Sequence, residues 1–339
     1  MASFSATAGS GRRFLFGAIV ALVSLYVVGV IALMWWWDHE PPHFDVAATA
    51  QARIAAKNEH VVTGTITTAA LITSAETLLD KRGGYLSNDR FPPGVLMDNV
   101  PNWEFGVLTA TRDLVQSLRN AFSRSQTQSV EDKDLQEADP LFSSPNDRWL
   151  LPSSESQYRK AVAHVDGYLT RLSDDDASNA QFYARADNLT DYLQTVSARL
   201  GSLSQRLSAA AGQVRIDTDL AGDQHAQQST PALSPRMVQT PWNKIDDNFY
   251  EARGYTWALR EQLEAIRIDF APILASKNAA VSLEQVIREL EESQKPIGSP
   301  MVLNGTPFGF FANHSLVMAN YISRANAAVI DLRELLKRG

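Results

Sequence analysis

Apolar residues recur at alternating steps of three and four positions through most of the chain, which is the spacing of amphipathic helices that pack against one another. The longest seams cover residues 182–214, 242–273 and 311–336, and shorter ones cover 107–122 and 158–172. The first seam consists of Phe182, Ala186, Leu189, Leu193, Val196, Leu200, Leu203, Leu207, Ala210 and Val214. Sustained alternation with a period of two is absent from the sequence, so we expect no β-sheet. The pattern predicts an all-α fold, a bundle of long antiparallel helices with heptad-like seams.

Residues 45–82 also follow a helical pattern, which is rich in alanine at first and then rich in threonine around Gly64. Threonine lowers helix propensity, so the pattern leaves open whether this helix is continuous. Start signals accompany several helices. Asn102 and either Ser153 or Ser154 are placed to cap the helices that follow them, and Ser282 with Gln285 forms a capping box.

Three polar segments interrupt the helical pattern. Residues 83–101 are punctuated by glycine and proline and predict a loop, and residues 124–152 are rich in Ser, Gln and Asp. Residues 217–241 carry three prolines and separate two of the long seams, so they form either a long crossover or a flexible linker. We interpret all three as polar insertions in one helical domain.

An uncharged apolar segment at residues 14–37 is long enough to cross a bilayer as a helix. Arg12 and Arg13 precede it, and Asp38 and Glu40 follow it. Because positive residues are retained in the cytoplasm, this asymmetry predicts a cytoplasmic N-terminus and an exported C-terminal part.

The topology divides the chain into a cytoplasmic tail (residues 1–13), a transmembrane helix (14–37) and a periplasmic helical domain (38–339). The tryptophans at residues 35–37 suit the aromatic belt of the outer membrane interface. The location expected from this pattern is the bacterial inner membrane, with the lipid bilayer as the partner of residues 14–37. The sequence does not fix the oligomeric state.

A cleaved signal peptide is the competing interpretation of the apolar segment. A signal peptide has a shorter apolar region that ends near a small-x-small site. The first such site here is Ala48-Thr49-Ala50, well beyond the tryptophans. The spacing therefore favours an uncleaved signal-anchor.

Composition excludes several classes of site. The chain has no cysteine, so disulfides, thiolate metal sites and cysteine nucleophiles are excluded. The net charge is −7, and the part after the apolar segment is more acidic still, because Arg12 and Arg13 are the only charges before Asp38. Such a domain is repelled by nucleic acid, which we do not expect as a partner. No catalytic constellation or cofactor motif is found in the sequence, so we expect no enzyme activity and no cofactor.

The sequence His39-Glu40-Pro41-Pro42-His43 matches the letters of the zincin motif. That chemistry needs both histidines on one face of a helix, with the glutamate as the general base. Two consecutive prolines do not fit inside such a turn. We therefore interpret the segment as a stiff elbow between the membrane helix and the domain.

The best candidate for recognition is the region of residues 83–106, with residues 303–314 similar in character. Loops on a rigid scaffold often carry recognition, but Asn and Asp also satisfy their own backbone in turns. The loop therefore either binds a partner or plugs the end of the bundle. The candidate recognition residues are Asn88, Asp89, Asp98, Asn99, Asn102 and Trp103.

Long strings across the chain resemble an uncharacterised family of proteobacterial single-pass inner-membrane proteins, a domain of unknown function. They are GGYLSND at 83–89, PPGV at 92–95, PNWEFGVL at 101–108, SRSQTQS at 123–129, FYARADNL at 182–189, GSLSQRLS at 201–208, FYEARG at 249–254 and ANHSLVMANYISRANAA at 312–328. The resemblance covers nearly the whole chain from Trp36 on. It implies the same topology and a single unit over residues 38–339, and it supplies no activity.

Two functions are compatible with these observations. The first is a membrane-anchored periplasmic interaction or scaffold protein of the cell envelope that binds another envelope protein. The alternative is a periplasmic ligand-binding or sensing domain. Because the cytoplasmic tail is too short for a signalling module, such a sensor would act with a membrane partner.

Overall fold

The computed structural model describes residues 8–57, 59–124, 130–174, 176, 178–215, 236–299 and 301–338. Its helices are α1 (Ala8–Trp37), α2 (Val46–Ala55), α3 (Thr65–Asp80), α4 (Asn99–Ser117), α5 (Lys133–Phe142), α6 (Ser154–Ser173), α7 (Ala186–Ser208), α8 (Ile245–Asp269), α9 (Ala271–Ser276), α10 (Ala280–Ser293) and α11 (His314–Lys337). Short 3-10 segments are η1 (Gly94–Leu96), η3 (Ala209–Ala211) and η4 (Trp242–Lys244), and the π-helical η2 (Leu118–Phe122) extends α4.

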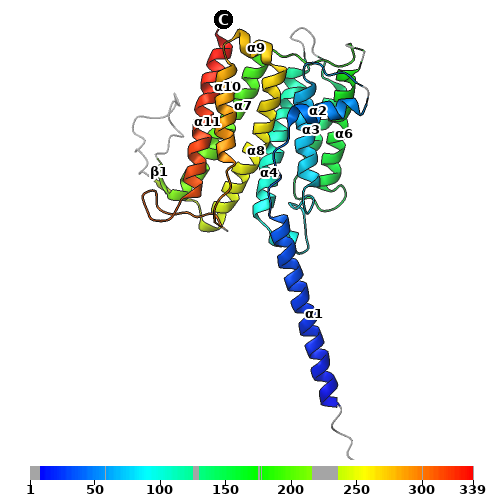
Figure 1. The fold of residues 1–339 in the computed structure, drawn as a ribbon, viewed down its shortest axis with the longest axis vertical. Coiled ribbons are helices and arrows are strands. Elements are labelled where there is room, and N and C mark those ends of the chain that lie inside the picture. Colours follow the sequence, from blue (N-terminus) through cyan, green and yellow to red (C-terminus); the bar gives the residue numbers. More distant parts are fainter. Residues whose placement is uncertain are drawn as a thin grey trace, which may run out of the picture.

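The long helices pack side by side in a bundle, and α1 projects from one end of it as a stalk (Figure 1). The fold is all-α, as predicted, except for a two-stranded antiparallel ribbon of β1 (Gln213–Arg215) and β2 (Arg236–Val238). The expectation of no sheet misses this ribbon, whose strands are too short to show a period of two. The ribbon follows the C-terminal end of α7. Its two strands are joined by residues 216–235, which lie outside the described residues and include most of the 217–241 insertion.

Neighbouring helices are antiparallel in most pairs, but α4 and α8 are parallel. Near the start of both helices, Asn102 of α4 donates a hydrogen bond to Asp247 of α8. Further along both helices, Tyr255 of α8 donates a hydrogen bond to Asp113 of α4. The prediction of an antiparallel bundle is wrong for this pair. Helices that are joined by a short connection pack antiparallel. Because α5, α6 and α7 lie between α4 and α8 in the chain, no short connection imposes that direction on this pair.

The heptad seams form the core, as the sequence predicts. Leu193 and Leu200 of α7 are fully buried, and Leu207 is almost so. The first seam extends beyond its helix at both ends, since Phe182 precedes α7 and Val214 belongs to β1. Phe182 still packs against the core, where its ring contacts the rings of Phe122 and Phe270.

The helical region of residues 45–82 is broken into α2 and α3. Gly64 begins α3 with a φ of 94°, a conformation that favours glycine, and a Cβ there would fall 2.2 Å from the Phe182 ring. Ser153 caps α6 as predicted, by accepting a hydrogen bond from the Ser156 amide. The predicted cap at Asn102 is wrong, because α4 begins at Asn99 with Asp98 as its cap. The capping box at Ser282 is also wrong, because α10 begins before it, at Ala280.

The start of α3 is held by a buried carboxylate of α8. Asp269 accepts hydrogen bonds from the amide and the hydroxyl of Thr67, each at 2.7 Å. Burial nevertheless raises the pKa of Asp269 above its ordinary value, because desolvation outweighs these hydrogen bonds.

We expect Asp269 to stabilise the domain less at neutral pH than in acid. A folded-state pKa above the unfolded value of 3.8 means that the folded chain binds this proton more tightly. Stability relative to an Asp269→Asn variant should therefore fall as pH rises through the raised pKa. Melting temperatures of both proteins across that range measure the difference, and a difference independent of pH would contradict the assignment.

Candidate functional site

The chain between α1 and α2 lies in an extended conformation against α8. Glu40 forms a two-pronged ion pair with Arg253, with distances of 2.6 Å and 2.5 Å from its oxygens to Nε and Nη2. Arg253 is buried, and its remaining donors reach the carbonyl oxygens of Ser293, Gln294 and Lys295 at the end of α10. One guanidinium thus ties the α1 linker, α8 and α10 together.

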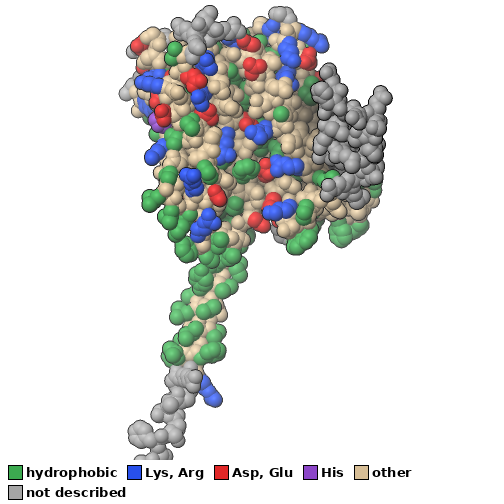
Figure 2. All heavy atoms as spheres, turned by 180° about the vertical axis from the view of Figure 1, so that it is seen from behind, with side chains coloured by type: hydrophobic (Ala, Val, Ile, Leu, Met, Phe, Trp, Pro, Cys, Tyr) green, Lys and Arg blue, Asp and Glu red, His purple; other side chains and the backbone are tan. Residues whose placement is uncertain are grey.

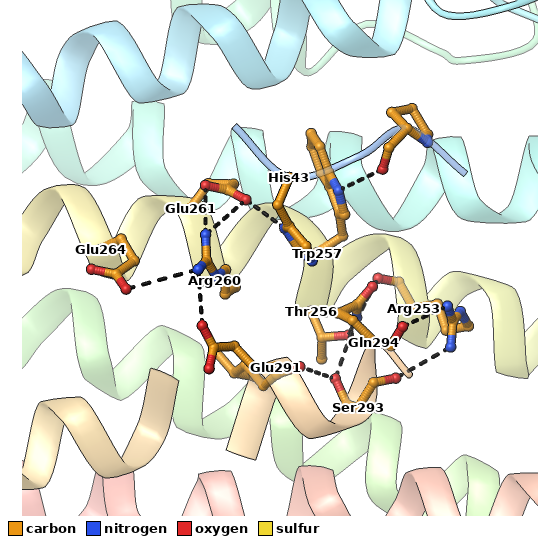
Figure 3. A network of polar contacts seen from close by, with 12 residues as sticks. His43, Arg253, Thr256, Trp257, Arg260, Glu261, Glu264, Glu291, Ser293 and Gln294 are labelled. Atoms are coloured by element: carbon orange, nitrogen blue, oxygen red, sulfur yellow. Dashed lines mark hydrogen bonds and ion pairs between the residues drawn. The ribbon is translucent and has the colours of Figure 1, made fainter. Parts of the chain in front are cut away.

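Two further contacts continue along the same face of α8 (Figure 3). The indole of Trp257 donates a hydrogen bond of 3.1 Å to the carbonyl of Pro41, and His43 Nδ1 lies 2.5 Å from the fully buried carboxylate of Glu261. Arg260 contacts Glu261 as well and bridges to Glu291 of α10. We call the contacts of Glu40, Pro41 and His43 with α8 the linker clasp.

The predicted elbow at residues 39–43 is confirmed as non-helical. The two histidines of the sequence HEPPH face different partners: the His39 ring contacts Trp35 edge-on, and His43 contacts Glu261. Among the described residues, no group of three or more His, Cys, Asp or Glu side chains is arranged to hold a metal ion.

A buried carboxylate holds the loop that follows α3. Glu104 of α4 is fully buried and accepts hydrogen bonds of 2.8 Å from the amides of Leu86 and Ser87. It also pairs with the ammonium of Lys81, which itself contacts the carbonyl of Gly84. This internal ion pair fixes the first turn of the 83–101 loop on the end of the bundle.

A cleft of about 410 Å³ lies between the linker clasp, α4 and α8. Burial raises the pKa of Asp38, and burial together with the carboxylates of Asp38 and Glu40 raises that of Tyr250 to about 12. Both effects come from the low-dielectric, acidic side of the cleft. Residues that line it are Asp38, His39, Glu40, Pro41, Lys81, Val100, Trp103, Tyr250, Arg253, Pro296 and Ile297.

Three of the predicted recognition residues are used inside the protein. Trp103 is 1% exposed, and its ring packs 5.3 Å from that of Trp257. Asn88 is also buried and donates hydrogen bonds to the carbonyl of Arg148 and the carboxylate of Glu155. Asn102 donates to Asp247, as described above. These contacts engage the three side chains within the protein.

The other three predicted residues lie closer to solvent. Asp98 is exposed and accepts a hydrogen bond from the amide of Asn99, one of the N–H groups at the start of α4 that have no partner within the helix. Asp89 is half-buried, and burial raises its pKa. Asp98 and Asn99 border a groove of about 300 Å³ against the last turns of α1, where Met34 and Trp35 form the other wall.

A family model described as an uncharacterized protein conserved in bacteria (DUF2333) matches residues 10–339. The chain belongs to the DUF2333 family. No curated protein and no solved structure matches it significantly. The DUF2333 match covers the apolar helix, the linker clasp and the bundle.

The apolar helix of this DUF2333 chain has the length and hydropathy of a membrane span. It is the one helix in the described part of the chain that does, with a mean hydropathy of 2.7 over its best window and none of that window buried. A signal sequence near the N-terminus passes the same test.

The linker clasp is the part of the candidate site that the sequence of this DUF2333 chain does not predict. Arg253 and Glu261 are charged residues on a helix that is buried almost all round, and such residues require partners. Charged residues at buried positions therefore indicate that α8 takes part in a buried ion pair. They do not identify the partner, because Glu40 lies 213 positions from Arg253.

We expect Glu40→Ala to lower the stability of the full chain by about 2 kcal/mol, because it leaves a buried guanidinium with carbonyl partners only. Glu292→Ala is the matched control, because the pair of Glu292 with Lys295 is exposed and screened by solvent, so its loss should change stability little. Thermal unfolding in detergent compares the two. Equal losses would argue against a structural role for the clasp.

Proposed function

We propose that this protein is an anchored interaction platform of the bacterial cell envelope, a scaffold that binds another envelope protein. Residues 14–37 span the inner membrane, residues 1–13 stay in the cytoplasm and residues 38–339 form the periplasmic domain. The observation that carries the proposal is the linker clasp. A domain joined to its anchor by buried ion pairs is held in one orientation at the membrane, whereas a flexible tether would leave it free to rotate.

The clasp also supports an uncleaved anchor. The small-x-small site at Ala48-Thr49-Ala50 lies within α2, and Ala50 is fully buried. Cleavage there would remove Glu40 and His43, and it would leave buried Arg253 with carbonyl partners only and buried Glu261 with Arg260 alone.

The charges that flank the apolar segment of residues 14–37 support the orientation. Arg12 and Arg13 lie before the apolar segment, and the first charges after it are acidic. Positive residues remain on the cytoplasmic side, so the bundle is exported.

A pair of reporter fusions tests this topology. Alkaline phosphatase, which is active only outside the cytoplasm, should be active when it is fused after Gly339. Green fluorescent protein, which does not become fluorescent when exported unfolded, should stay dark when it is fused at the same position. The intact mass of the purified protein should include residues 14–37. The inverse reporter pattern, or a mature N-terminus near residue 50, would refute the anchored topology.

Crosslinking in native membranes tests the platform function. We expect a discrete envelope protein to crosslink to the unchanged chain, and its recovery to fall in a Glu40→Ala/His43→Ala variant, in which the anchor remains but the clasp is broken. Glu292→Ala is the control and should keep the partner. If no discrete protein crosslinks, the platform proposal fails; if the clasp variant keeps full recovery, fixed orientation is not part of the function.

The cleft beside the clasp supports ligand binding as a second candidate. Its lining includes Lys81, Tyr250 and Arg253, and the buried indole nitrogen of Trp103 has no hydrogen-bond partner among the described residues. Such an N–H favours a ligand with an acceptor atom. Native mass spectrometry of protein purified from membranes should then show a bound small molecule that Trp103→Phe releases. Unloaded protein of the expected mass would exclude this candidate.

A further inference from the structure

Exposed aromatic side chains of the helical domain gather at one end of it. Outside α1, the exposed aromatic residues of the described chain are Phe91, Trp149, Trp242, Phe308, Phe310 and Phe311. Each lies in a segment that joins the helices at the end from which α1 leaves (Figure 1). The opposite end of the described bundle has valines as its exposed large apolar side chains, namely Val61, Val62, Val130 and Val281. Large aromatic groups therefore distinguish the α1 end.

The first patch is the segment between α10 and α11. Residues 296–313 contain no charged side chain. The base of this loop is fixed, because Asn313 donates a hydrogen bond of 2.9 Å to Asn304, and Asn304 donates one of 2.9 Å to the carbonyl of Ala210. Its tip then presents Phe308 and Phe310, which are fully exposed, together with the exposed Phe311, and Met301 is exposed just before the base.

The second patch lies on the other side of α1, where two loops meet. The rings of Phe91 and Trp149 are in edge contact at 5.9 Å. Hydrogen bonds from Asn88 and Arg90 to the backbone of residues 147–148 join the loops. The exposed apolar residues of this second patch are Phe91, Val95, Leu96, Trp149, Leu150 and Leu151.

Figure 2 shows hydrophobic side chains along the lower rim of the domain on both sides of the stalk, whereas charged side chains are spread over the surface above. Trp35 and Trp36 at the end of α1 are exposed as well. Aromatic residues partition to the interface between hydrocarbon and headgroups, and clustered exposed apolar residues otherwise lower solubility.

We propose that the two patches insert into the interfacial layer of the phospholipid bilayer, so that the domain rests on the membrane at three points: α1 and one patch on each side of it. The proposal rests on the membrane anchor proposed above, because α1 directs this end of the domain toward the bilayer. The charges at this end are of both signs, including Arg90, Arg148, Asp98 and Asp147. Insertion is therefore driven by apolar contact and does not require anionic lipid.

Site-directed spin labelling of the full chain in liposomes tests the proposal, since the native sequence has no cysteine to remove. Single variants Phe310→Cys and Leu150→Cys report on the two patches. Val130→Cys and Val281→Cys are matched controls at the opposite end, and Val23→Cys reports on the anchor. The measurement compares collision of each nitroxide with oxygen, which concentrates in lipid, and with a water-soluble nickel complex.

We expect the ratio of oxygen to nickel collision to be several-fold higher at positions 310 and 150 than at 130 and 281. It should be the same in liposomes of phosphatidylcholine and in liposomes with added phosphatidylglycerol. If positions 310 and 150 are as accessible to nickel as the controls while position 23 is in lipid, docking is refuted and the anchor stands. If position 23 is also accessible to nickel, the anchor fails and docking fails with it. Protection of one patch alone would refute the three-point arrangement.

Discussion

Gly254→Ala should destabilise the domain by about 3 kcal/mol, because it places a methyl group inside a neighbouring backbone. A Cβ at Gly254 of α8 would lie 1.9 Å from the carbonyl oxygen of Trp103 in α4. Gly106 faces the same crossing from the other side, with its Cβ position 2.1 Å from the carbonyl oxygen of Glu251. Backbone atoms cannot rotate away as a flexible side chain can, so the parallel pair of α4 and α8 would have to separate.

Gly201→Ala in α7 is the matched control. The nearest atom to its Cβ position is the side-chain nitrogen of Asn326 at 3.6 Å, an ordinary contact. Alanine there should stabilise the helix by about 0.5–1 kcal/mol through its lower conformational entropy in the unfolded chain. Urea unfolding of both variants gives the comparison. If Gly254→Ala were as stable as Gly201→Ala, the close crossing of α4 and α8 would be wrong.

Glu104→Ala should lower stability by about 3–5 kcal/mol, because the ammonium of Lys81 would be buried without its counter-charge. The amides of Leu86 and Ser87 would lose their acceptor at the same time. The 83–101 loop should also become less ordered, because the carboxylate of Glu104 holds its first turn. Hydrogen exchange of the Leu86 and Ser87 amides, measured beside the free energy of unfolding, would show whether the loop is released.

Asp80→Ala provides the control for this prediction. Asp80 precedes Lys81, and its ion pair with Arg159 is more than half exposed on both sides. Exposed pairs contribute about 0–1 kcal/mol, so this variant should remain close to the unchanged protein. A loss at Glu104 no greater than the loss at Asp80 would mean that the buried network does not hold the loop.

The long helices could be predicted from sequence because their information is local. The seams of α7, α8 and α11 repeat over many turns, and each buried position follows from the one before it. Helix α5 was missed within the polar 124–152 segment. It has only Leu135, Ala138 and Phe142 as buried residues, and it contains Pro140 near its end. Three apolar positions in a polar segment are too few to establish a period.

Packing direction and the linker clasp depend on contacts that the sequence does not encode locally. The parallel pairing of α4 and α8 results from three helices that lie between them in the chain. The partners His43 and Glu261 are separated by 218 positions. Neither the spacing of charges nor their type identifies such a pair without the fold.

Residue type marks the candidate recognition residues, but it does not show how the fold engages each of them. Asn88 and Asn102 are engaged by neighbouring loops and by α8. Trp103 is part of the core. Proline and glycine mark residues 83–98 as a loop, whereas residues 99–101 of the predicted loop belong to α4. The side chains that give the loop its position, Lys81 and Glu104, lie beyond its ends.

The central claim is that an uncleaved membrane helix holds the bundle in one orientation. Distances between α1 and the domain test this claim most directly. Leu25 of α1 and Arg288 of α10 are exposed, so both accept a spin label after substitution by cysteine. Pulsed electron paramagnetic resonance of the doubly labelled full chain in liposomes should give one narrow distance distribution, which broadens in the Glu40→Ala/His43→Ala variant. A broad distribution in the chain with an intact clasp would contradict the account.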